Sequence, residues 1–323
     1  MDVSFGVVGL GMGMNRSSQI HGTDGATLVA ACDLDEARLE KAKTQFDCEG
    51  HTDYQEMCDR DDIDVIWVML PSGMHAKFGV QAAQAGKNVI TTKPMDVTIE
   101  ACDALTAACA ENDVKLLIDF EERFRPANRK IKKAIDEGLL GDVILGEIRL
   151  KWWRGEVYFH GWHGTWKQDG GGSLANQGVH QLDLLQWFLG DVDSVSGHFG
   201  VYGGHEHREV ETEDLLHAHV QFKSGAVGAI LTTTTTPGKA QTQVQVHGVK
   251  GIVGTGPDVW EFVEDGVDVE IEDGPRNTTE DCISVLREGT EPTCGGDEGR
   301  KTVELFNAIY QSGREKTSVS LPL

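Results

Sequence analysis

The first 120 residues alternate short apolar runs with longer segments of helical spacing, and this alternation restricts the possible folds more than any other feature. Runs rich in Val, Ile and Leu predict five β-strands: FGVVGLG, TLVAACD, DVIWVML, KNVITTKP and VKLLIDF. The segments between them predict helices, among them DEARLEKAKTQF, MHAKFGVQAAQAG and TIEACDALTAACAEND. Strands that alternate with helices form parallel sheets covered on both faces. With right-handed crossovers, the pattern predicts a doubly wound α/β domain.

The pattern changes after Pro126. A predicted helix, ANRKIKKAIDEGLLG, precedes the predicted strand VILGEIRLKWW, an aromatic loop and a second helix led by glycines. Residues 192–272 then consist mainly of consecutive predicted strands, which end with VDVEIED. Strands in succession with glycine turns predict a mostly antiparallel sheet. The segment GDEGRKTVELFNAIYQSGRE predicts a closing helix.

These patterns predict two domains. Residues 1–122 form the α/β domain with the doubly wound parallel sheet. Residues 123–323 form an α+β domain with a large, mostly antiparallel sheet. The closing helix, at about residues 297–313, could pack back on the first domain.

Charge and cysteine content exclude several classes of protein. A net charge of −23 disfavours nucleic acid and anionic membranes as partners, because phosphate binding needs clustered Lys and Arg. The chain has no apolar run of the roughly 18 residues that a membrane span requires. The N-terminus enters a strand without a basic region or cleavage site, which favours a cytoplasmic protein. The seven scattered cysteines lack a C-x-x-C pair and favour free thiols.

The segment GLGMGMNRS follows the first predicted strand and opens a helix. Gly9 and Gly11 begin a G-x-G-x-x-G pattern, but Met14 holds its third position and Gly13 comes one place early. Asp33 ends the next strand about twenty residues on, which is the spacing of a dinucleotide site. Glycines there let the backbone approach a pyrophosphate at the helix N-terminus. The alternative is a tight strand–helix turn beside a solvated aspartate.

The carboxylate of Asp33 can accept hydrogen bonds from ribose hydroxyls. No arginine stands beside it in the sequence, and Arg38 comes a turn further on. A carboxylate repels a 2′-phosphate, so NAD is favoured as the cofactor and NADP is kept as an alternative. The predicted cofactor-binding residues of this region are Gly9, Gly11, Met12, Gly13, Met14 and Asp33.

The segments LPSGMH and TTKPM stand at the carboxyl ends of two predicted strands. Open α/β sheets bind ligands at that edge. Lys93 is therefore expected in a crevice, where it can orient a substrate hydroxyl and stabilise developing charge. The alternative is a surface lysine before a turn proline. The cofactor contacts predicted here are Leu70, Pro71, His75, Thr92 and Lys93.

The segment GGGSLANQGVHQLD begins a helix that is apolar on most of its surface. Asn176, His180 and Asp183 have i, i+4 and i+7 spacing, which predicts one polar stripe. The three leading glycines would let the chain pack closely against a cofactor or substrate. Asp183 could orient His180 or anchor the helix. For His180 alone, a satisfied core histidine is the alternative to a functional group.

The segment KWWRGEVYFHGWHGTW is rich in aromatic residues. Aromatic faces stack on sugar rings, and Lys151, Arg154 and His163 could bind hydroxyls, although lid and core packing must account for at least half of these residues. The HEH and HAH triplets at 205–207 and 217–219 lack a third ligand in sequence, so no metal site is predicted.

The order of these motifs resembles that of the glucose–fructose oxidoreductase/inositol dehydrogenase (Gfo/Idh/MocA) family. The segments GLG, PSGMH, AGKNVITTKP, GGGSLANQGVHQLDLLQWFLG and EPTCGGDEGRKTVELFNAIYQSG follow in the family's order through nearly the whole chain. The resemblance implies a Rossmann domain with a bound nicotinamide cofactor and a second domain built on a large, mostly antiparallel sheet. It also implies a sugar-like substrate and a homodimer or homotetramer formed through that sheet.

The resemblance also implies catalytic residues. Lys93 corresponds to the lysine of the family's E-K-P motif, although Thr92 replaces the glutamate. His180 corresponds to the histidine of the G-G-G-x-x-x-D-x-x-x-H motif, in which Asn176 replaces the common aspartate. EERF at 121–124 departs from the usual N-R-R-F, which leaves its role open. The predicted substrate-binding residues are Lys93, Arg154, Trp162, His163, Asn176 and His180.

We therefore predict an NAD-dependent dehydrogenase that oxidises a secondary hydroxyl of a sugar, inositol or sugar derivative, or reduces the matching ketone. Lys93 positions and polarises the hydroxyl, His180 acts as the general acid/base, and Asn176 aids placement. One alternative is a redox-neutral enzyme with tightly bound NAD that eliminates or epimerises. Another is a sensor of sugars or nucleotides without turnover, against which the presence of both Lys93 and His180 weighs.

Overall fold

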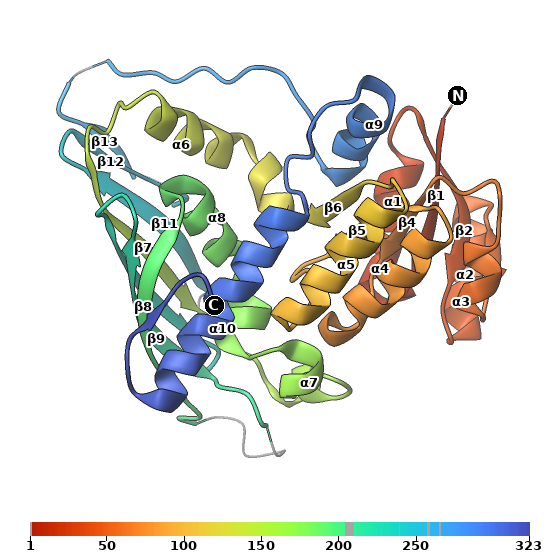
Figure 1. Ribbon diagram of the computed structural model, residues 1–323, viewed down its shortest axis with the longest axis horizontal. Coiled ribbons are helices and arrows are strands. Elements are labelled where there is room, and N and C mark those ends of the chain that lie inside the picture. Colours follow the sequence, from red (N-terminus) through yellow and green to blue (C-terminus); the bar gives the residue numbers. More distant parts are fainter. Residues whose placement is uncertain (1, 204–209, 239, 257–258, 265) are drawn as a thin grey trace. The chain divides into compact units, whose positions relative to one another are not determined.

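The computed structural model describes residues 2–203, 210–238, 240–256, 259–264 and 266–323 (Figure 1). The chain forms two compact units. The first unit contains Met1–Glu121 and Pro275–Arg300, and the second contains Glu122–Gly274 and Lys301–Leu323. Residues 275–300 thus belong to the first unit, whereas the sequence pattern assigns them to the second domain.

The first unit contains a parallel sheet in the order β3-β2-β1-β4-β5-β6. Its strands are β1 (Val3–Val8), β2 (Ala26–Cys32), β3 (Glu49–His51), β4 (Val65–Val68), β5 (Asn88–Thr92) and β6 (Leu116–Asp119). The five predicted strands and the doubly wound α/β fold are confirmed. The short strand β3 is an addition to the prediction.

The helices of the first unit follow its strands in the chain. They are α1 (Leu10–His21), α2 (Glu36–Phe46), α3 (Tyr54–Cys58), η1 (Ser72–Met74, a 3₁₀ helix), α4 (His75–Gln84), α5 (Ile99–Glu111) and α9 (Thr278–Glu288). Helix α1 contacts α2, and α4 contacts α5. Helices α2, α4 and α5 agree with the prediction, whereas α3 and α9 were not predicted.

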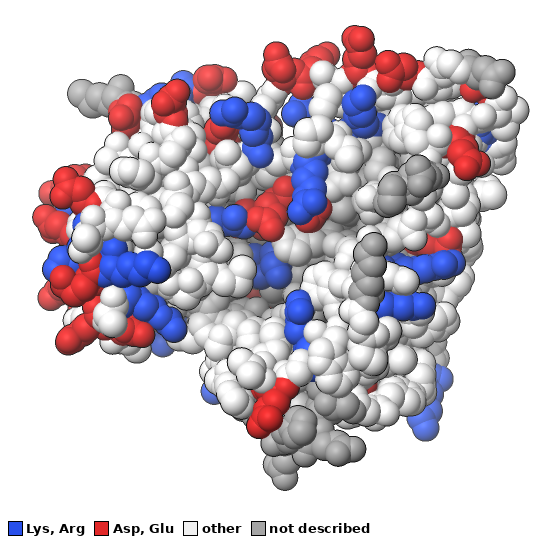
Figure 2. Space-filling model, turned by 180° about the vertical axis from the view of Figure 1, so that it is seen from behind, with Lys and Arg blue, Asp and Glu red and all other residues white. Residues whose placement is uncertain are grey.

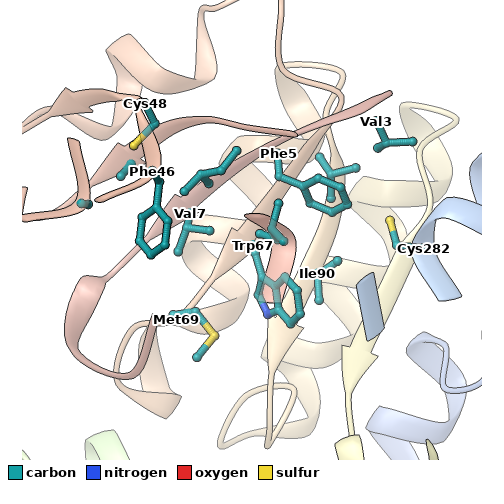
Figure 3. Packing of buried hydrophobic residues seen from close by; sticks show 14 of the residues in the cluster. Val3, Phe5, Val7, Phe46, Cys48, Trp67, Met69, Ile90 and Cys282 are labelled. Carbon is teal, nitrogen blue, oxygen red and sulfur yellow. The ribbon is translucent and has the colours of Figure 1, made fainter. Parts of the chain in front are cut away.

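The apolar core of the first unit explains why residues 275–300 belong to it. Figure 3 shows Phe5, Val7, Trp67 and Ile90 from three neighbouring strands in this core, and all four are fully buried. Cys282 of α9 lies in the same core and is fully buried as well. Helix α9 therefore covers part of the sheet of the first unit.

A buried polar cluster connects three elements of this unit. Arg16 of α1 donates from Nε to Asp119 Oδ2 at 2.7 Å, and Thr278 Oγ1 donates to Asp119 Oδ1 at 2.6 Å. Burial raises the pKa of the Asp119 carboxyl, and the neighbouring Arg16 opposes that shift. The cluster links α1, the end of β6 and the start of α9.

The second unit contains a sheet in the order β13-β12-β11-β7-β10-β9-β8-β14, in which only the β7–β10 pair is parallel. Its strands are β7 (Val143–Lys151), β8 (Val192–Gly200), β9 (Leu215–Phe222), β10 (Val227–Thr233), β11 (Gln241–Gly248), β12 (Gly251–Gly254), β13 (Trp260–Phe262) and β14 (Val319–Ser320). The predicted α+β fold with a large, mostly antiparallel sheet is confirmed.

The helices of the second unit lie between these strands and after them. They are α6 (Pro126–Asp136), η3 (Glu156–Phe159, a 3₁₀ helix), α7 (Trp166–Asp169), η4 (Ser173–Gly178, a π-helix) and α8 (Val179–Leu189). The 3₁₀ helix η2 (Glu121–Phe124) stands at the boundary between the units, and α10 (Gly296–Glu315) begins in the first unit and continues into the second. Helix α10 has the bounds of the predicted closing segment.

The prediction of a strand at VDVEIED is wrong, because residues 267–273 form no strand. The backbone N–H of Val269 bonds the side chain of Asp268 at 2.9 Å, and the carbonyl of Glu272 accepts from Arg129 of α6 at 2.7 Å. Side chains thus satisfy backbone groups that a strand would pair with a neighbour.

Helix α8 covers one face of the eight-stranded sheet (Figure 1). A Cβ on Gly146 of β7 would lie 2.5 Å from Leu185 of α8, so Gly146 faces the helix. Because side chains alternate along a strand, Leu145, Glu147 and Arg149 point to the other face. We call this other face the open face of the sheet.

Acidic and basic side chains lie near one another on the side of the molecule drawn in Figure 2. Glu40 pairs with Lys43 at 2.6 Å, and Glu280 pairs with Arg276 at 2.6 Å. Exposed pairs of this kind contribute little to stability. The excess of 52 acidic over 29 basic residues therefore bears on solubility more than on the fold.

Candidate active site

The turn between β1 and α1 depends on glycine. Gly9 has a φ of 89°, and a Cβ there would lie 2.6 Å from the carbonyl oxygen of Met69. A Cβ on Gly13 would lie 3.1 Å from Cγ1 of Val7, so glycine lets α1 approach the sheet. In the G-x-G-x-x-G pattern the third glycine lets the helix pack closely on the strand. Gly13 has this role here, one position before the place of that third glycine.

The first turn of α1 offers an anion site. Gly11 is exposed, and a Cβ there would have only the Arg38 guanidinium nearby, at 3.7 Å. No acidic residue occupies this turn, so the positive end of the helix dipole is not neutralised locally. Met12 is 68% exposed, whereas Met14 packs against the core. These residues fit a dinucleotide pyrophosphate at the helix N-terminus.

Asp33 lies beside this turn. Its Oδ2 accepts from the Leu10 N–H at 2.6 Å, and its Oδ1 accepts from the Asp35 N–H at 2.9 Å. Nη1 of Arg38 lies 3.8 Å from Asp33 Oδ2, although Arg38 stands a turn further along the chain. Leu34, which was not predicted as part of the site, is 88% exposed next to this carboxylate. Arg38 therefore lies closer to Asp33 than their separation in the sequence had indicated.

His75 joins the segments that follow β4 and β5. Its Nδ1 lies 2.7 Å from the carbonyl oxygen of Pro94, and its Nε2 lies 2.7 Å from that of Leu70. Burial lowers the pKa of His75, while the two carbonyls and the nearby Asp96 carboxylate oppose that shift. Since His75 is only 1% exposed, its observed contacts are those of a residue that holds two loops together.

The other four cofactor contacts predicted in these two segments, Leu70, Pro71, Thr92 and Lys93, are partly exposed. Leu70 and Pro71 follow β4, Thr92 ends β5, and Lys93 comes next. Strands β4 and β5 are neighbours, so both segments lie at the same carboxyl edge of the sheet. The backbone of Lys93 is anchored next to Pro94, whose carbonyl faces His75. This edge is where open α/β sheets bind ligands.

In the second unit, the helix led by glycines is not one α-helix. Residues 173–178 form the π-helix η4, and α8 begins at Val179. The N–H of Gln177 reaches the carbonyl of Gly172 at 3.3 Å, an i to i+5 bond. The prediction of one regular stripe from Asn176 to Asp183 is therefore wrong. Because the π turn is wider, both Asn176 and Gln177 face the polar cluster described below.

The glycines before η4 are required by protein contacts. A Cβ on Gly171 would lie 2.1 Å from the Tyr310 hydroxyl of α10. A Cβ on Gly172 would lie 1.9 Å from the carbonyl oxygen of Glu213. The expectation that these positions keep space for a cofactor or substrate is therefore corrected, since Tyr310 and Glu213 fill that space.

Asn176 belongs to a buried polar cluster. Its Oδ1 accepts from the Tyr158 hydroxyl at 2.7 Å, and its Nδ2 donates to Asp169 Oδ1. Gln177 Nε2 donates to the same hydroxyl at 2.8 Å, and His163 Nδ1 lies 3.0 Å from Asp169 Oδ1. Tyr158, Asp169, Asn176 and Gln177 line a pocket of the second unit. The reverse orientation of the Asn176 amide would oppose two oxygens at Asp169, so its orientation is determined.

The aromatic segment contributes a stack to this cluster. The ring centroids of Trp162 and His163 are 3.8 Å apart, and those of His163 and Tyr158 are 4.2 Å apart. Arg154 joins the cluster through Gln177 Oε1, at 2.8 Å from its Nε. Arg154, His163 and Asn176 are thus brought together, and the Trp162 ring lies tilted by 33° against that of His163. Tyr158, Asp169 and Gln177 were missed because single polar residues in helical segments of four to six residues carry no periodic signal.

His180 is the second residue of α8 and is partly exposed. Asp183, one turn later, accepts from Nε and Nη2 of Arg123 at 2.9 and 2.7 Å. The Arg123 guanidinium also lies 5.4 Å from the ring of Trp187. Asp183 therefore anchors α8 to the EERF segment, which gives Arg123 of that segment a structural role.

The candidate metal ligands fall partly outside the described residues. The HEH triplet at 205–207 lies outside the described residues, and His217 and His219 are exposed on β9. Within the described ranges, no three His, Cys, Asp or Glu residues are arranged to hold a metal ion. All seven cysteines are free and buried, and burial raises the pKa of Cys58 to about 11. No helix in the described part of the chain could cross a bilayer.

Comparison with known families identifies both parts of the chain. Residues 3–120 match the oxidoreductase family with an NAD-binding Rossmann fold. Residues 128–254 match the GFO/IDH/MocA C-terminal domain.

Comparison with known proteins gives similarity over nearly the full length. The WlbA dehydrogenase of Chromobacterium violaceum, solved with NADH and UDP-GlcNAcA, is 30% identical with a TM-score of 0.91 and covers 100% of this chain and 96% of its own. WlbA of Bordetella pertussis, solved with the same two ligands, is 29% identical with a TM-score of 0.91 over 100% and 98% of the two chains. Inositol 2-dehydrogenase of Rhizobium meliloti is 25% identical over 99% of this chain and 100% of its own.

Proposed function

The chain belongs to the GFO/IDH/MocA family of NAD-binding oxidoreductases, and on that basis we propose how it works as an NAD-dependent sugar dehydrogenase. The reaction is oxidation of one secondary hydroxyl of a sugar, inositol or sugar derivative, or reduction of the matching ketone. The similarity to dehydrogenases over nearly the full length carries this proposal. The redox-neutral enzyme and the sensor are not favoured, because the named relatives are dehydrogenases.

Each proposed catalytic residue has one task. NAD, when bound, accepts the hydride from the carbon that bears the hydroxyl. Lys93 orients this hydroxyl and stabilises the negative charge that develops on its oxygen. His180 takes the hydroxyl proton as general base. Asn176 holds a neighbouring hydroxyl with an amide that Tyr158 and Asp169 keep in one orientation.

The reaction is tested by NADH absorbance. The protein is mixed with NAD and a panel of pyranoses, inositols, glycosides and nucleotide-linked sugars. The last group is included because the two WlbA structures contain NADH and UDP-GlcNAcA. We expect NADH to form with at least one class. No NADH with any member, by a protein shown to bind NAD, would contradict the proposal.

Cofactor preference gives the first specific prediction. We expect wild-type protein to bind NAD more tightly than NADP, and Asp33→Asn to narrow this preference by about tenfold, which is roughly 1.4 kcal/mol. Asparagine keeps an oxygen for the Leu10 N–H but removes the charge that repels a 2′-phosphate. Dissociation constants of both cofactors, measured by tryptophan fluorescence, give the result.

Arg38→Ala is the matched control for Asp33→Asn. The Arg38 guanidinium lies 3.8 Å from Asp33 and is the cation nearest to that carboxylate among the ion pairs of the described residues. Removal of the guanidinium should weaken the binding of NADP and leave the affinity for NAD nearly unchanged. A wild-type protein that prefers NADP would refute the assigned role of Asp33.

We also propose a homodimer or homotetramer that uses the open face of the sheet. Val227, Ala229 and Leu231 of β10 pair in register with Leu145, Glu147 and Arg149 of β7 and so share its open face. These three apolar side chains are partly exposed. They form an apolar strip on one of the central strands, where a second copy could pack.

Leu231→Lys tests this assembly. A lysine in the centre of the interface would be buried without a partner, so we expect the subunits to associate at least about tenfold more weakly. Sedimentation velocity across a concentration series measures the change. Gln243→Lys on β11, farther from the strip, should have a smaller effect. A wild-type protein that sediments as a monomer would exclude the assembly.

We place the protein in the cytoplasm. All seven thiols are free, which a reducing compartment maintains. Fractionation of the host cells, followed by detection of the protein, tests this placement, and recovery outside the cytoplasm would overturn it.

A further inference from the structure

Arg154 differs from most arginines of this acidic chain in the partner that holds it. Arg16, Arg60, Arg123, Arg276 and Arg300 all pair with carboxylates. Arg154 instead donates from Nε, at 2.8 Å, and from Nη2 to the neutral Oε1 of Gln177. Within the described residues, no carboxylate forms an ion pair with it. Its positive charge is therefore not neutralised by the described part of the chain.

Two aromatic rings hold the guanidinium in place. Cζ of Arg154 lies 4.6 Å from the ring centroid of Trp152 and 5.2 Å from that of Tyr158. Such contacts stabilise a cation without cancelling its charge. Burial raises the pKa of the Tyr158 phenol, so this ring remains neutral. The side chain is preorganised, which lowers the entropy lost when it binds a ligand.

The bonds to Gln177 leave part of the guanidinium available. A guanidinium has five N–H donors in a planar fork, and Gln177 engages Nε and Nη2. The edge formed by the two terminal nitrogens matches the paired oxygens of a carboxylate or phosphate. A single hydroxyl would use only a fraction of this edge.

Arg154 is joined to Asn176 through a short chain of hydrogen bonds. Gln177, which holds Arg154, donates to the Tyr158 hydroxyl at 2.8 Å, and that hydroxyl donates to Asn176 at 2.7 Å. The carboxylate in this cluster, Asp169, is 2% exposed and bonds Asn176, His163 and the Gly164 N–H. The buried carboxylate of Asp169 therefore has its hydrogen-bond partners within the cluster. Arg154, in contrast, is held by the neutral amide of Gln177.

We propose that Arg154 selects an anionic substrate by binding an oxyanion, a carboxylate or a phosphate, carried by the sugar. The inference rests on the proposed function and specifies its substrate class as sugar acids or phosphate-bearing sugars. Neutral sugars and inositols lack the group that this arginine is arranged to bind. Because the contact is electrostatic, the preference for the anionic substrate falls as salt rises.

Matched substrate pairs test the inference. D-glucose is compared with D-glucuronate, with glucose 1-phosphate and with uridine-diphosphate forms of glucose and glucuronate. We expect wild-type protein to favour an anionic member over its neutral counterpart by about 10²-fold in kcat/KM. Preference for glucuronate identifies a carboxylate as the bound group, and preference for glucose 1-phosphate identifies a phosphate. Preference for D-glucose over both overturns the inference.

Variants of Arg154 separate recognition from chemistry. Arg154→Gln should lower kcat/KM for the preferred anion by about 10²-fold, mainly through KM, and leave the neutral sugar nearly unchanged. Arg154→Lys should recover part of the loss, since it restores charge without the planar fork. Arg314→Gln is the control, because Arg314 also lies over an aromatic ring, 4.7 Å from Trp166. An equal loss for charged and neutral substrates in Arg154→Gln would refute the inference.

A binding measurement distinguishes failure of the inference from failure of the proposed function. Glucuronate and glucose 1-phosphate are titrated separately into protein saturated with NADH, and tryptophan fluorescence is followed. Anion binding that Arg154→Gln abolishes, with no turnover of any sugar, would support the inference and refute the dehydrogenase. Turnover of neutral sugars without anion binding would support the dehydrogenase and refute the inference.

Discussion

Replacing Lys93 by alanine should lower kcat by about 10²–10⁴-fold, the usual loss when a group that stabilises developing charge or transfers a proton is removed. Lys93 follows β5 at the ligand-binding edge of the first unit and is partly exposed. Its neighbour Pro94 is held through its carbonyl by His75, at 2.7 Å. The side chain therefore projects from an anchored backbone, and its loss should affect chemistry rather than folding.

The measurement combines kinetics and binding. Steady-state kcat is determined at saturating NAD and substrate, and NADH affinity is determined by fluorescence. We expect NADH affinity and the melting temperature of Lys93→Ala to change little. Lys77→Ala, at an exposed position of α4, is the matched control and should retain normal turnover. Near-normal turnover in Lys93→Ala would show that this lysine is peripheral to the reaction.

The α/β part of the fold could be predicted because its strands are buried on both faces. Val65, Ile66, Trp67 and Val68 of β4 are fully buried, and such runs stand out as continuous apolar segments. The edge strand β3 has only three residues, Glu49–His51, and lacks an apolar run. It was therefore missed.

The C-terminal elements show where local patterns are insufficient. VDVEIED alternates like a strand, yet its Val269 N–H and its Glu272 carbonyl bond the side chains of Asp268 and Arg129. Helix α9 belongs to the first unit because Cys282 is buried in that core, about 160 residues after the last strand of the sheet. Neither contact is encoded by periodicity, since each depends on residues distant in sequence.

In the predicted site, too, some residues could be recognised from the local sequence, whereas others depend on contacts between distant residues. Gly9 and Asp33 could be recognised, because a strand, a turn and a helix in succession determine their positions. The bond that Arg154 donates to Gln177 joins residues 23 positions apart, and Gln177 lies in a π-helix. The glycines before the π-helix are required by Glu213 and Tyr310, which lie too far along the chain for any local window to include.

Replacing Asn176 by aspartate should lower the free energy of unfolding by about 3 kcal/mol above neutral pH, as expected for a buried charge without a partner. Asn176 Nδ2 donates to the carboxylate of Asp169, which is 2% exposed. An aspartate at 176 would place two carboxylates against each other. Asparagine therefore fits this position better than the aspartate common in the family, because Asp169 already supplies the negative charge.

The loss of stability in Asn176→Asp should increase as pH rises. Two adjacent carboxyls cannot both ionise readily, so they share a proton and their pKa in the folded variant rises above the unfolded value of about 4. A raised folded-state pKa gives stability that is present below the unfolded pKa and is lost as pH rises through the folded one. The variant should thus approach wild-type stability near pH 4 and fall below it as pH increases.

The exchanged pair distinguishes charge repulsion from lost packing. In the double variant Asn176→Asp with Asp169→Asn, one amide again faces one carboxylate, so we expect at least half of the lost stability to return at pH 8. The Gly164 N–H and His163 Nδ1, which both face Asp169 in the wild type, retain an amide side chain as partner. Denaturant unfolding of the four proteins at pH 5 and pH 8 gives the coupling energy at each pH. If Asn176→Asp alone is as stable as wild type at pH 8, the amide–carboxylate bond does not determine residue 176. If the double variant is no more stable than Asn176→Asp alone, the loss of unfolding free energy arises from packing rather than from charge repulsion.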